Sequence, residues 1–226
     1  DLCENAIFIK RAHENPKKSM QNEHFRLYFV CFYGGSLMTK RLFACFVVLV
    51  FLFLACDSGS SKNNDRHGLT DEEWEAFTYT NFARTDPQGF AAQFLAPLHA
   101  QGTDNGAYED LMSRTPVPAL QLSDGLIAAA RAHSQDLNEN CKTLQHDSCD
   151  GTSWYERIAA YYSGNTLAEN AAGGFVSGLD VVLAWIIDSG VPSLGHRQNL
   201  LNPNYVHVGF GQAGTFWTQD FGAGGE

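Results

Sequence analysis

Residues 195–211 read GHRQNLLNPNYVHVGFG, and this stretch sets the fold of the C-terminal part of the chain. Its first part is polar and carries His196. Its second part alternates, with Val206 and Val208 on one side of an extended segment and a histidine between them. Residues 216–221 alternate in the same way. The sequence therefore predicts two β-strands at this end of the chain.

Signals for helix starts precede four earlier segments. The predicted N-cap residues are Thr70, Asp86, Ser123 and Ser177. The last of these helices is expected to end at Asp188, and a short strand is expected at residues 167–171. Residues 100–118 carry the Gly, Asp, Asn and Pro of a long loop. Helices first and strands last predict an α+β fold, in which helices cover a small antiparallel sheet.

Two histidines and a glutamate stand in short polar elements between the apolar segments. They are His146, Glu169 and His196. Neutral imidazoles bind zinc at about 2.0–2.1 Å and leave other coordination positions for water or substrate. A carboxylate can be a third ligand, orient an imidazole, or accept a proton from bound water. These residues predict a ligand cleft that holds zinc or another divalent metal. Glu169 and Asn170 point to opposite faces of a strand, and we expect Glu169 to face the cleft.

The N-terminal part is similar to an export signal. Lys40 and Arg41 precede an apolar run at residues 42–55, whose fourteen positions are too few to span a bilayer that needs about 20. The run ends at Cys56 in a pattern similar to a bacterial lipobox, although Phe53 stands where an aliphatic residue is usual. We therefore expect Cys56 to be lipidated. The alternative is an ordinary cleaved signal peptide with a cysteine nearby.

These features divide the chain into four parts. Met38 is a natural start for the signal, so residues 1–37 are interpreted as an upstream segment that is not native, with a pair of membrane helices as the competing account. Residues 38–56 are the lipoprotein signal peptide. Residues 57–68 are small and polar, and they are expected to form a flexible tether. Residues 69–226 suffice for one domain with a single hydrophobic core.

Two cysteines remain beyond the anchor, Cys141 and Cys149. In an oxidising compartment such a pair predicts a disulfide, which would close a nine-residue loop around His146. The alternative is a zinc site made of these cysteines and His146. It lacks the CxxC pair that marks structural zinc sites.

The chain is acidic: from Asp57 onward it holds 8 Lys and Arg against 21 Asp and Glu. Nucleic acids are bound through cationic side chains, so this charge excludes them as partners. It also disfavours adhesion to anionic lipid, which leaves the anchor at Cys56 as the route to a membrane. We expect an extracellular or cell-envelope protein, anchored to the membrane as a lipoprotein.

Five segments follow one another in the order of a known family. They read TNFARTDPQGFA, LIAAARAHSQDLNENC, LAENAAGG, WIIDSGVPSLGHRQNLLNPNYVHVGFG and WTQDFG. No single segment is specific to that family, but the five segments together, in this order, are. The chain resembles the bacterial SCP-like branch of the CAP superfamily, which includes cysteine-rich secretory, antigen 5 and pathogenesis-related proteins. The resemblance covers residues 69–222.

The resemblance implies a three-layer α-β-α sandwich and a cleft lined by two histidines and two acids. On the matching positions these are His146, Glu169 of the AEN motif and His196 of the GHR motif. The second acid falls at Asp188, where the family has a glutamate one methylene longer; either Asp188 substitutes for that glutamate or water completes the cleft. We call His146, Glu169, Asp188 and His196 the tetrad. It is the candidate catalytic or binding set, with His146 and His196 as the metal ligands.

Three functions are open. The first is a binding module whose cleft takes a metal, a peptide, a lipid or another small molecule; the resemblance implies lipid and sterol binding for some relatives. The second is a zinc-dependent hydrolase, a peptidase or esterase, in which Glu169 activates water. The third is a structural envelope protein whose polar cluster only fixes loops. No GxSxG elbow, HExxH helix or phosphate-binding glycine loop follows the leader, which favours the first.

Three further polar residues have structural interpretations. His133 lies on an apolar helix stripe and is expected to be a core histidine bonded to backbone. His207 is expected on the surface of the sheet. Arg197 is expected to form a salt bridge or to cap carbonyl groups.

Overall fold

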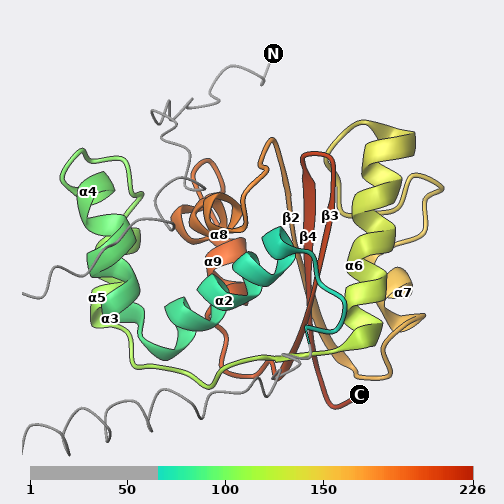
Figure 1. Cartoon of the computed structure of the whole chain (residues 1–226), viewed down its shortest axis with the longest axis horizontal. Helices are drawn as coiled ribbons and strands as arrows, with labels where there is room; N and C mark the ends of the chain where they lie inside the picture. The colour runs from blue at the N-terminus through green and yellow to red at the C-terminus, as the bar shows by residue number, and fades with distance from the viewer. Residues whose placement is uncertain (1–65, 226) are drawn as a thin grey trace, which may run out of the picture. The chain divides into compact units, whose positions relative to one another are not determined.

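The computed structural model describes residues 66–225, in which helices cover both faces of a four-stranded sheet (Figure 1). The helices are α2 (Asp71–Thr85), α3 (Pro87–Phe90), α4 (Ala96–His99), α5 (Ala107–Ser113), α6 (Asp124–Asp136), α7 (Trp154–Ala159), α8 (Gly178–Ile187) and α9 (Gly195–Leu200). The π-helical turns are η2 (Ala91–Leu95) and η3 (Leu137–Cys141). The strands are β1 (Gln121–Leu122), β2 (Thr166–Gly173), β3 (His207–Ala213) and β4 (Phe216–Ala223).

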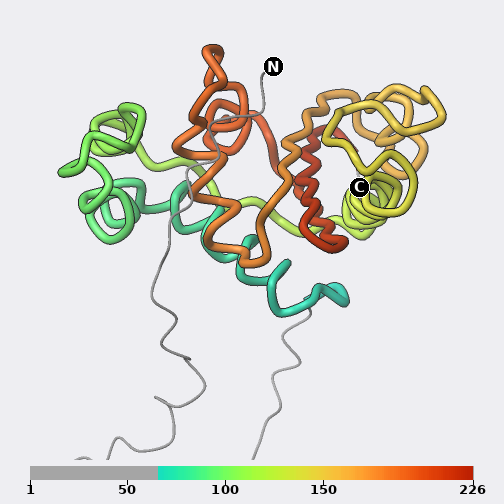
Figure 2. The backbone as a smooth tube through the Cα atoms, turned by 90° about the horizontal axis from the view of Figure 1, so that it is seen from above, coloured from blue at the N-terminus to red at the C-terminus, as the bar shows by residue number. Residues whose placement is uncertain are grey.

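The helices form two layers that sandwich the sheet. α6 and α7 lie on one side of it, and α2, α8 and α9 lie on the other, with α3, α4 and α5 at the far end of that second layer (Figures 1 and 2). This arrangement confirms the predicted α-β-α sandwich.

The order of strands in the sheet is β1–β3–β4–β2. β4 pairs antiparallel with both β2 and β3, as the alternating patterns predicted. β1 instead pairs parallel with β3, with Gln121 opposite His207. The sheet is therefore mixed, and the prediction of an antiparallel sheet is wrong at this edge. A strand of two residues shows no alternation in the sequence that could reveal its direction.

All four predicted N-caps are present. Thr70 and Glu73 form a reciprocal capping box, in which each side chain accepts a hydrogen bond from the other residue's backbone amide. The side chains of Asp86, Ser123 and Ser177 each accept a hydrogen bond from a backbone amide in the first turn of their helix. Local side-chain chemistry therefore starts these helices where the sequence indicated.

Three helices, α5, α7 and α9, were not expected. α5 interrupts the predicted loop at residues 100–118. Its N-cap is Gly106, and Asp104 accepts a hydrogen bond from the backbone amide of Tyr108 in its first turn at 2.9 Å. α7 follows a capping box of Ser153 and Glu156, a pattern that was visible in the sequence. α7 matters for function because it carries a buried basic residue of the candidate site.

The main core lies between the sheet and the layer of α2 and α8, and it includes the buried side chains of Trp185 and Trp217. On the other face, α6 packs directly on β3. A Cβ atom at Gly209 would lie only 2.1 Å from the backbone of Leu126, so glycine is needed for this approach. The close packing brings His133 of α6 to the candidate site.

Several predicted features lie outside the described residues. They are the upstream segment 1–37, the signal peptide 38–56 with Cys56, and residues 57–65 of the tether. Within residues 66–225, no helix has the length and apolar character needed to cross a membrane.

Candidate functional site

The tetrad consists of two imidazole–carboxylate pairs. Nδ1 of His146 lies 2.8 Å from Oε1 of Glu169, and Nδ1 of His196 lies 2.7 Å from Oδ1 of Asp188. A carboxylate only accepts hydrogen bonds, so Nδ1 is the donor in both pairs. In the neutral imidazole this leaves Nε2 with its free electron pair, which is the state that binds a metal.

In each pair the acid is buried and the imidazole reaches solvent. The side chains of Glu169 and Asp188 are 1% and 0% exposed, whereas those of His146 and His196 are 53% and 22% exposed. The bond to Glu169 raises the pKa of His146 above its ordinary value and outweighs the opposite effect of burial. Each histidine therefore contacts one acid of the tetrad, and both rings are accessible.

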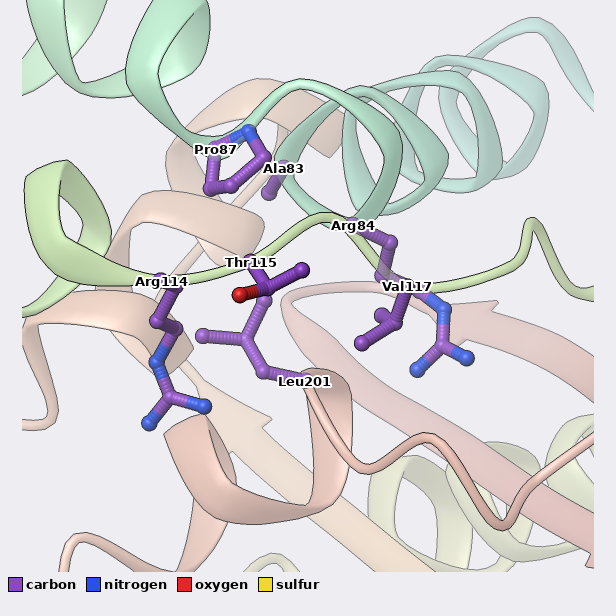
Figure 3. Close-up of a pocket in the computed structure, with 7 residues that line it drawn as sticks. All are labelled: Ala83, Arg84, Pro87, Arg114, Thr115, Val117 and Leu201. Carbon is purple, nitrogen blue, oxygen red and sulfur yellow. The ribbon is translucent and has the colours of Figure 1, made fainter.

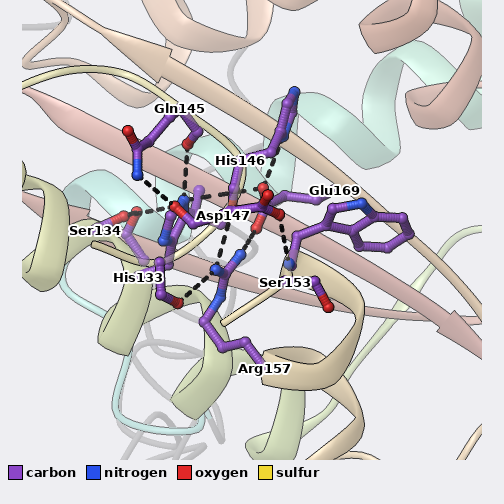
Figure 4. A network of polar contacts seen from close by, with 12 residues as sticks. His133, Ser134, Gln145, His146, Asp147, Ser153, Arg157 and Glu169 are labelled. Atoms are coloured by element: carbon purple, nitrogen blue, oxygen red, sulfur yellow. Dashed lines mark hydrogen bonds and ion pairs between the residues drawn. The ribbon is translucent and has the colours of Figure 1, made fainter. Parts of the chain in front are cut away.

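Arg157 of α7 is a further member of the site that the sequence did not single out. Its guanidinium pairs with Oε2 of Glu169 (Figure 4). Its Nη1 donates to the carbonyl of His146 and to the hydroxyl of Ser148, both at 3.0 Å. With 6% of its surface exposed, this one side chain holds both the acid and the loop that carries the histidine.

A second acid lies behind Glu169. Asp220 of β4 stands opposite Glu169 in the antiparallel ladder and is fully buried. Its carboxyl oxygens accept no hydrogen bond from a donor among residues 66–225, and its side chain instead interacts with the carboxyl group of Glu169. Burial and the charge of Glu169 raise the pKa of Asp220 well above its ordinary value. The protonated form is thus favoured, and Arg157 is left to balance the charge of Glu169.

His133 lies beside Glu169 in the interior. Its Nε2 donates to the carbonyl of Gln145 at 3.0 Å, which confirms the expected core histidine bonded to backbone. The same nitrogen lies 3.9 Å from Glu169. Burial lowers the pKa of His133, which favours its neutral form. The bond to Gln145 fixes the residue next to His146 in the chain.

The predicted disulfide joins Cys141 and Cys149, whose Cα atoms are 5.5 Å apart. These sulfurs therefore bond to each other, and not to a zinc ion as in the alternative. The backbone amide of Cys149 also donates to the carboxylate of Asp136 at 2.7 Å. The loop that carries His146 is thus held at both ends, by the disulfide to η3 and by Arg157 to α7.

Asp188 supports the second pair from the C-terminal end of α8. Its backbone is left-handed, with φ of 55°, a conformation in which Asp is better tolerated than most residues. Its Oδ2 accepts hydrogen bonds from the backbone amides of His196 and Arg197, at 2.9 and 3.2 Å. Despite its shorter side chain, Asp188 contacts His196 directly.

Both pairs adjoin β2, the strand at one edge of the sheet. Glu169 belongs to β2, and the side chain of its neighbour Asn170 donates to the carbonyl of His196 at 3.1 Å. Asn199 of α9 in turn donates to Asn170 Oδ1 at 3.0 Å and to the carbonyl of Glu169 at 3.3 Å. These amides attach α9 to the strand that carries Glu169.

The remaining polar residues have structural contacts. Arg197 donates to the carbonyls of Ile186, Ile187 and Asn105 and pairs with Asp110, as expected for a residue that caps carbonyl groups. His207 of β3 is half-buried, and its Nδ1 lies 2.8 Å from the hydroxyl of Tyr162.

The tetrad does not form a compact metal cage. Within residues 66–225, two groups of three His, Cys, Asp or Glu side chains have ligand atoms that all lie within 4.8 Å of one another, and neither includes a tetrad residue. They are Asp136 with Cys141 and Cys149, and His99 with Asp104 and Glu109. An ion at the tetrad would therefore have few protein ligands.

A small hollow lies away from the tetrad, at the ends of α2 and α9 (Figure 3). Arg84 and Arg114 are among its lining residues. Arg84 is fully buried and donates to the carbonyls of Pro118, Leu200 and Asn202 at 2.7 to 3.0 Å. Its guanidinium is thus used within the fold.

Comparison with known proteins gives relatives of this domain. The protein YkwD of Bacillus subtilis (strain 168), which is uncharacterised, is 37% identical over 105 residues, covering 45% of this chain and 38% of that protein. The uncharacterised membrane protein YlbC of the same organism is 33% identical over 93 residues, covering 41% of this chain and 25% of that protein. The chain thus spans well under half the length of these relatives.

Solved structures give a similar result. An extracellular protein with an SCP domain from Bacillus anthracis has 27% identity and a TM-score of 0.43, covering 48% of this chain and 35% of that one. An outer surface protein from Borrelia burgdorferi has 25% identity and a TM-score of 0.40, covering 57% and 90%. The model of the CAP cysteine-rich secretory protein family matches residues 72–221. The chain therefore belongs to the CAP, or cysteine-rich secretory protein, family.

Proposed function

We propose that this chain is an exported CAP-domain protein that binds a divalent metal ion of the zinc type through Nε2 of His146 and Nε2 of His196. The remaining coordination positions would be open to water or to an oxygen of a small ligand, such as a lipid or a peptide. The tetrad would act as a binding site, not as a complete hydrolytic centre.

The observation that carries this proposal is the orientation of the two imidazoles. Each presents Nδ1 to a buried carboxylate and has a solvent-accessible ring. In metal sites of proteins the ligating histidine commonly donates its other ring nitrogen to a carboxylate, which fixes the tautomer and strengthens the ligand. The arrangement of Glu169 and Asp188 matches this supporting role better than the role of direct ligand.

The contacts of Glu169 argue against the hydrolase alternative. A general base must accept a proton from a metal-bound water, and it does so best with a pKa near the working pH. Glu169 is instead held by Arg157 and by His146, one on each carboxylate oxygen. Both carboxylate oxygens of Glu169 are thus engaged by protein donors, which suits a support for His146 better than a base that activates water.

Export is supported by the disulfide. Disulfides persist mainly in oxidising compartments, and the bridge between Cys141 and Cys149 lies in the loop of the candidate site. Attachment to the membrane through a lipid on Cys56 is the part of the proposal that rests on the sequence alone.

Isothermal titration of the full chain with zinc tests the metal site. His196→Ala should lower the affinity at least about tenfold, a change of about 1.4 kcal/mol. Asp188→Asn should lower it by about 10- to 100-fold, because the imidazole loses its orienting partner. His67→Ala is the control, since His67 belongs to a different pair, with Asp124. Equal affinity in His196→Ala and His67→Ala would overturn the proposal and favour a purely structural role.

A further inference from the structure

Away from the tetrad, three side chains converge where α4, the α4–α5 connection and α5 meet. Nδ1 of His99 lies 3.3 Å from Oε1 of Glu109 and 3.5 Å from Oδ2 of Asp104. His99 is the last residue of α4, Asp104 lies in the connection, and Glu109 lies in the first turn of α5. We propose that His99, Asp104 and Glu109 form a second divalent-cation site, independent of the tetrad.

The donor set and its spacing fit a zinc-type cation. One imidazole nitrogen and two carboxylates are ligands that zinc and its neighbours accept, with water in the remaining position. Ligand atoms about 2.0–2.2 Å from a shared ion lie about 3.0–3.5 Å apart, depending on the coordination angle. The two distances from the His99 nitrogen fall in this range, and all three ligand atoms lie within 4.8 Å of one another.

The charge of the cluster also calls for a cation. Within residues 66–225, His99 is the one basic side chain within ion-pair distance of Asp104 or Glu109. The side chain of Asp104 is only 6% exposed, so solvent screens it poorly. Two carboxylates therefore face a single imidazole, and no lysine or arginine in the described part of the chain balances their charge. The nearby Asp110 differs, because it pairs with Arg114 and Arg197.

The ligands are held in place before any ion binds. The ring of His99 stacks on that of Tyr108, with 4.5 Å between centroids and 18° between planes. Asp104 accepts a hydrogen bond from the backbone amide of Tyr108 at 2.9 Å. Fixed ring orientation and a hydrogen-bonded carboxylate are the features that support metal ligands from outside the coordination sphere.

The position of the cluster suggests what the ion would do. The side chain of Asn105 donates to the carbonyls of Ile187 and Asp188, at 3.0 and 3.2 Å. Arg197 in turn donates to the carbonyl of Asn105 at 3.1 Å. A cation bound at Asp104 would therefore brace the segment that supports the Asp188–His196 pair.

The test uses the full chain with His146→Ala and His196→Ala, which removes both imidazoles of the tetrad. We expect this variant still to bind one zinc ion in isothermal titration. Adding Glu109→Gln or His99→Ala should lower that affinity at least about tenfold. Glu109 is 63% exposed, so its replacement leaves the fold intact. Glu72→Gln, at an exposed acid of α2, is the matched control.

Two results would overturn this inference. One is the absence of zinc binding in the variant that lacks both tetrad imidazoles. The other is equal zinc affinity after Glu109→Gln and Glu72→Gln, which would make the cluster an ordinary group of surface charges. Failure of the tetrad proposal is recognised separately, because it would appear as unchanged binding in His196→Ala with the α4–α5 cluster intact.

Discussion

Each imidazole of the tetrad takes its orientation from an acid that is shielded from solvent. For His146 this acid is itself clamped by Arg157, so one buried charge pair sets the direction of an exposed ring. For His196 the acid also accepts backbone amides at the start of α9. The buried acids therefore fix the orientation of both rings, while the rings themselves remain accessible to solvent.

The pKa of His146 is the first test of this account. The bond to Glu169 raises it, so NMR titration of the imidazole should give a value above 6.5, and Glu169→Gln should lower that value. A pKa raised by folding adds stability that is fully present below about pH 6.5 and is lost as the pH rises through the raised value. Protons compete with metal at the ring, so zinc binding should strengthen over the same rise in pH. A pKa at or below 6.5 would show that the ion pair does not persist in solution.

The buried ion pair of Arg157 and Glu169 is a second test. Arg157→Met keeps much of the side-chain volume but leaves a carboxylate buried without its cation, which should cost about 3–5 kcal/mol in the free energy of unfolding. Arg66→Met removes an exposed pair with Asp71 and should cost at most about 1 kcal/mol. Denaturant unfolding of both variants measures the difference. Equal losses would mean that Arg157 does not balance a buried charge.

The sequence identified the tetrad because polar residues in short elements between apolar segments are conspicuous, and because the motifs matched a family. It did not identify Arg157 or Asp220. In the sequence, Arg157 resembles an exposed residue of a helix, and Asp220 resembles an exposed residue of an alternating strand. Only the packing of the folded chain buries them. Their role depends on how α7 and β4 meet β2, which no local pattern specifies.

At the level of elements, the loop of His146 is held by the disulfide between Cys141 and Cys149. Closing a nine-residue loop is worth about 2.5 kcal/mol on the chain-entropy model. The double variant Cys141→Ser with Cys149→Ser should therefore lose about that much stability in denaturant unfolding. Its His146 resonances should also broaden, because the loop is freed at one end. Unchanged stability would show that the remaining contacts of the loop suffice.

The sequence predicted where helices begin, but it did not predict the direction in which a short strand pairs. Capping side chains act on their own first turn, so Thr70 and Ser177 located α2 and α8 from local chemistry alone. The parallel pairing of β1 depends on contacts with β3, far along the chain. α5 was missed because its seven residues lie in a stretch rich in loop-forming residues.

At the scale of the whole molecule, the proposed function includes export of the domain and its attachment to a membrane through a lipid on Cys56. Labelling with palmitate in a bacterial host should mark the protein, and Cys56→Ala should remove the label. Cys45→Ala, at a cysteine inside the apolar run, is the control and should keep it. Label retained in Cys56→Ala would place the lipid elsewhere or show an ordinary cleaved signal.

The central claim is that two acid-oriented imidazoles share one cation through Nε2. NMR of the full chain with nitrogen-15 in its histidines reads each ring nitrogen directly. Without metal, His146 and His196 should both be protonated at Nδ1 when neutral. One equivalent of zinc should then shift the Nε2 signals of both rings and leave Nδ1 protonated. Nε2 signals that do not move, or a shift at Nδ1 instead, would contradict the claim.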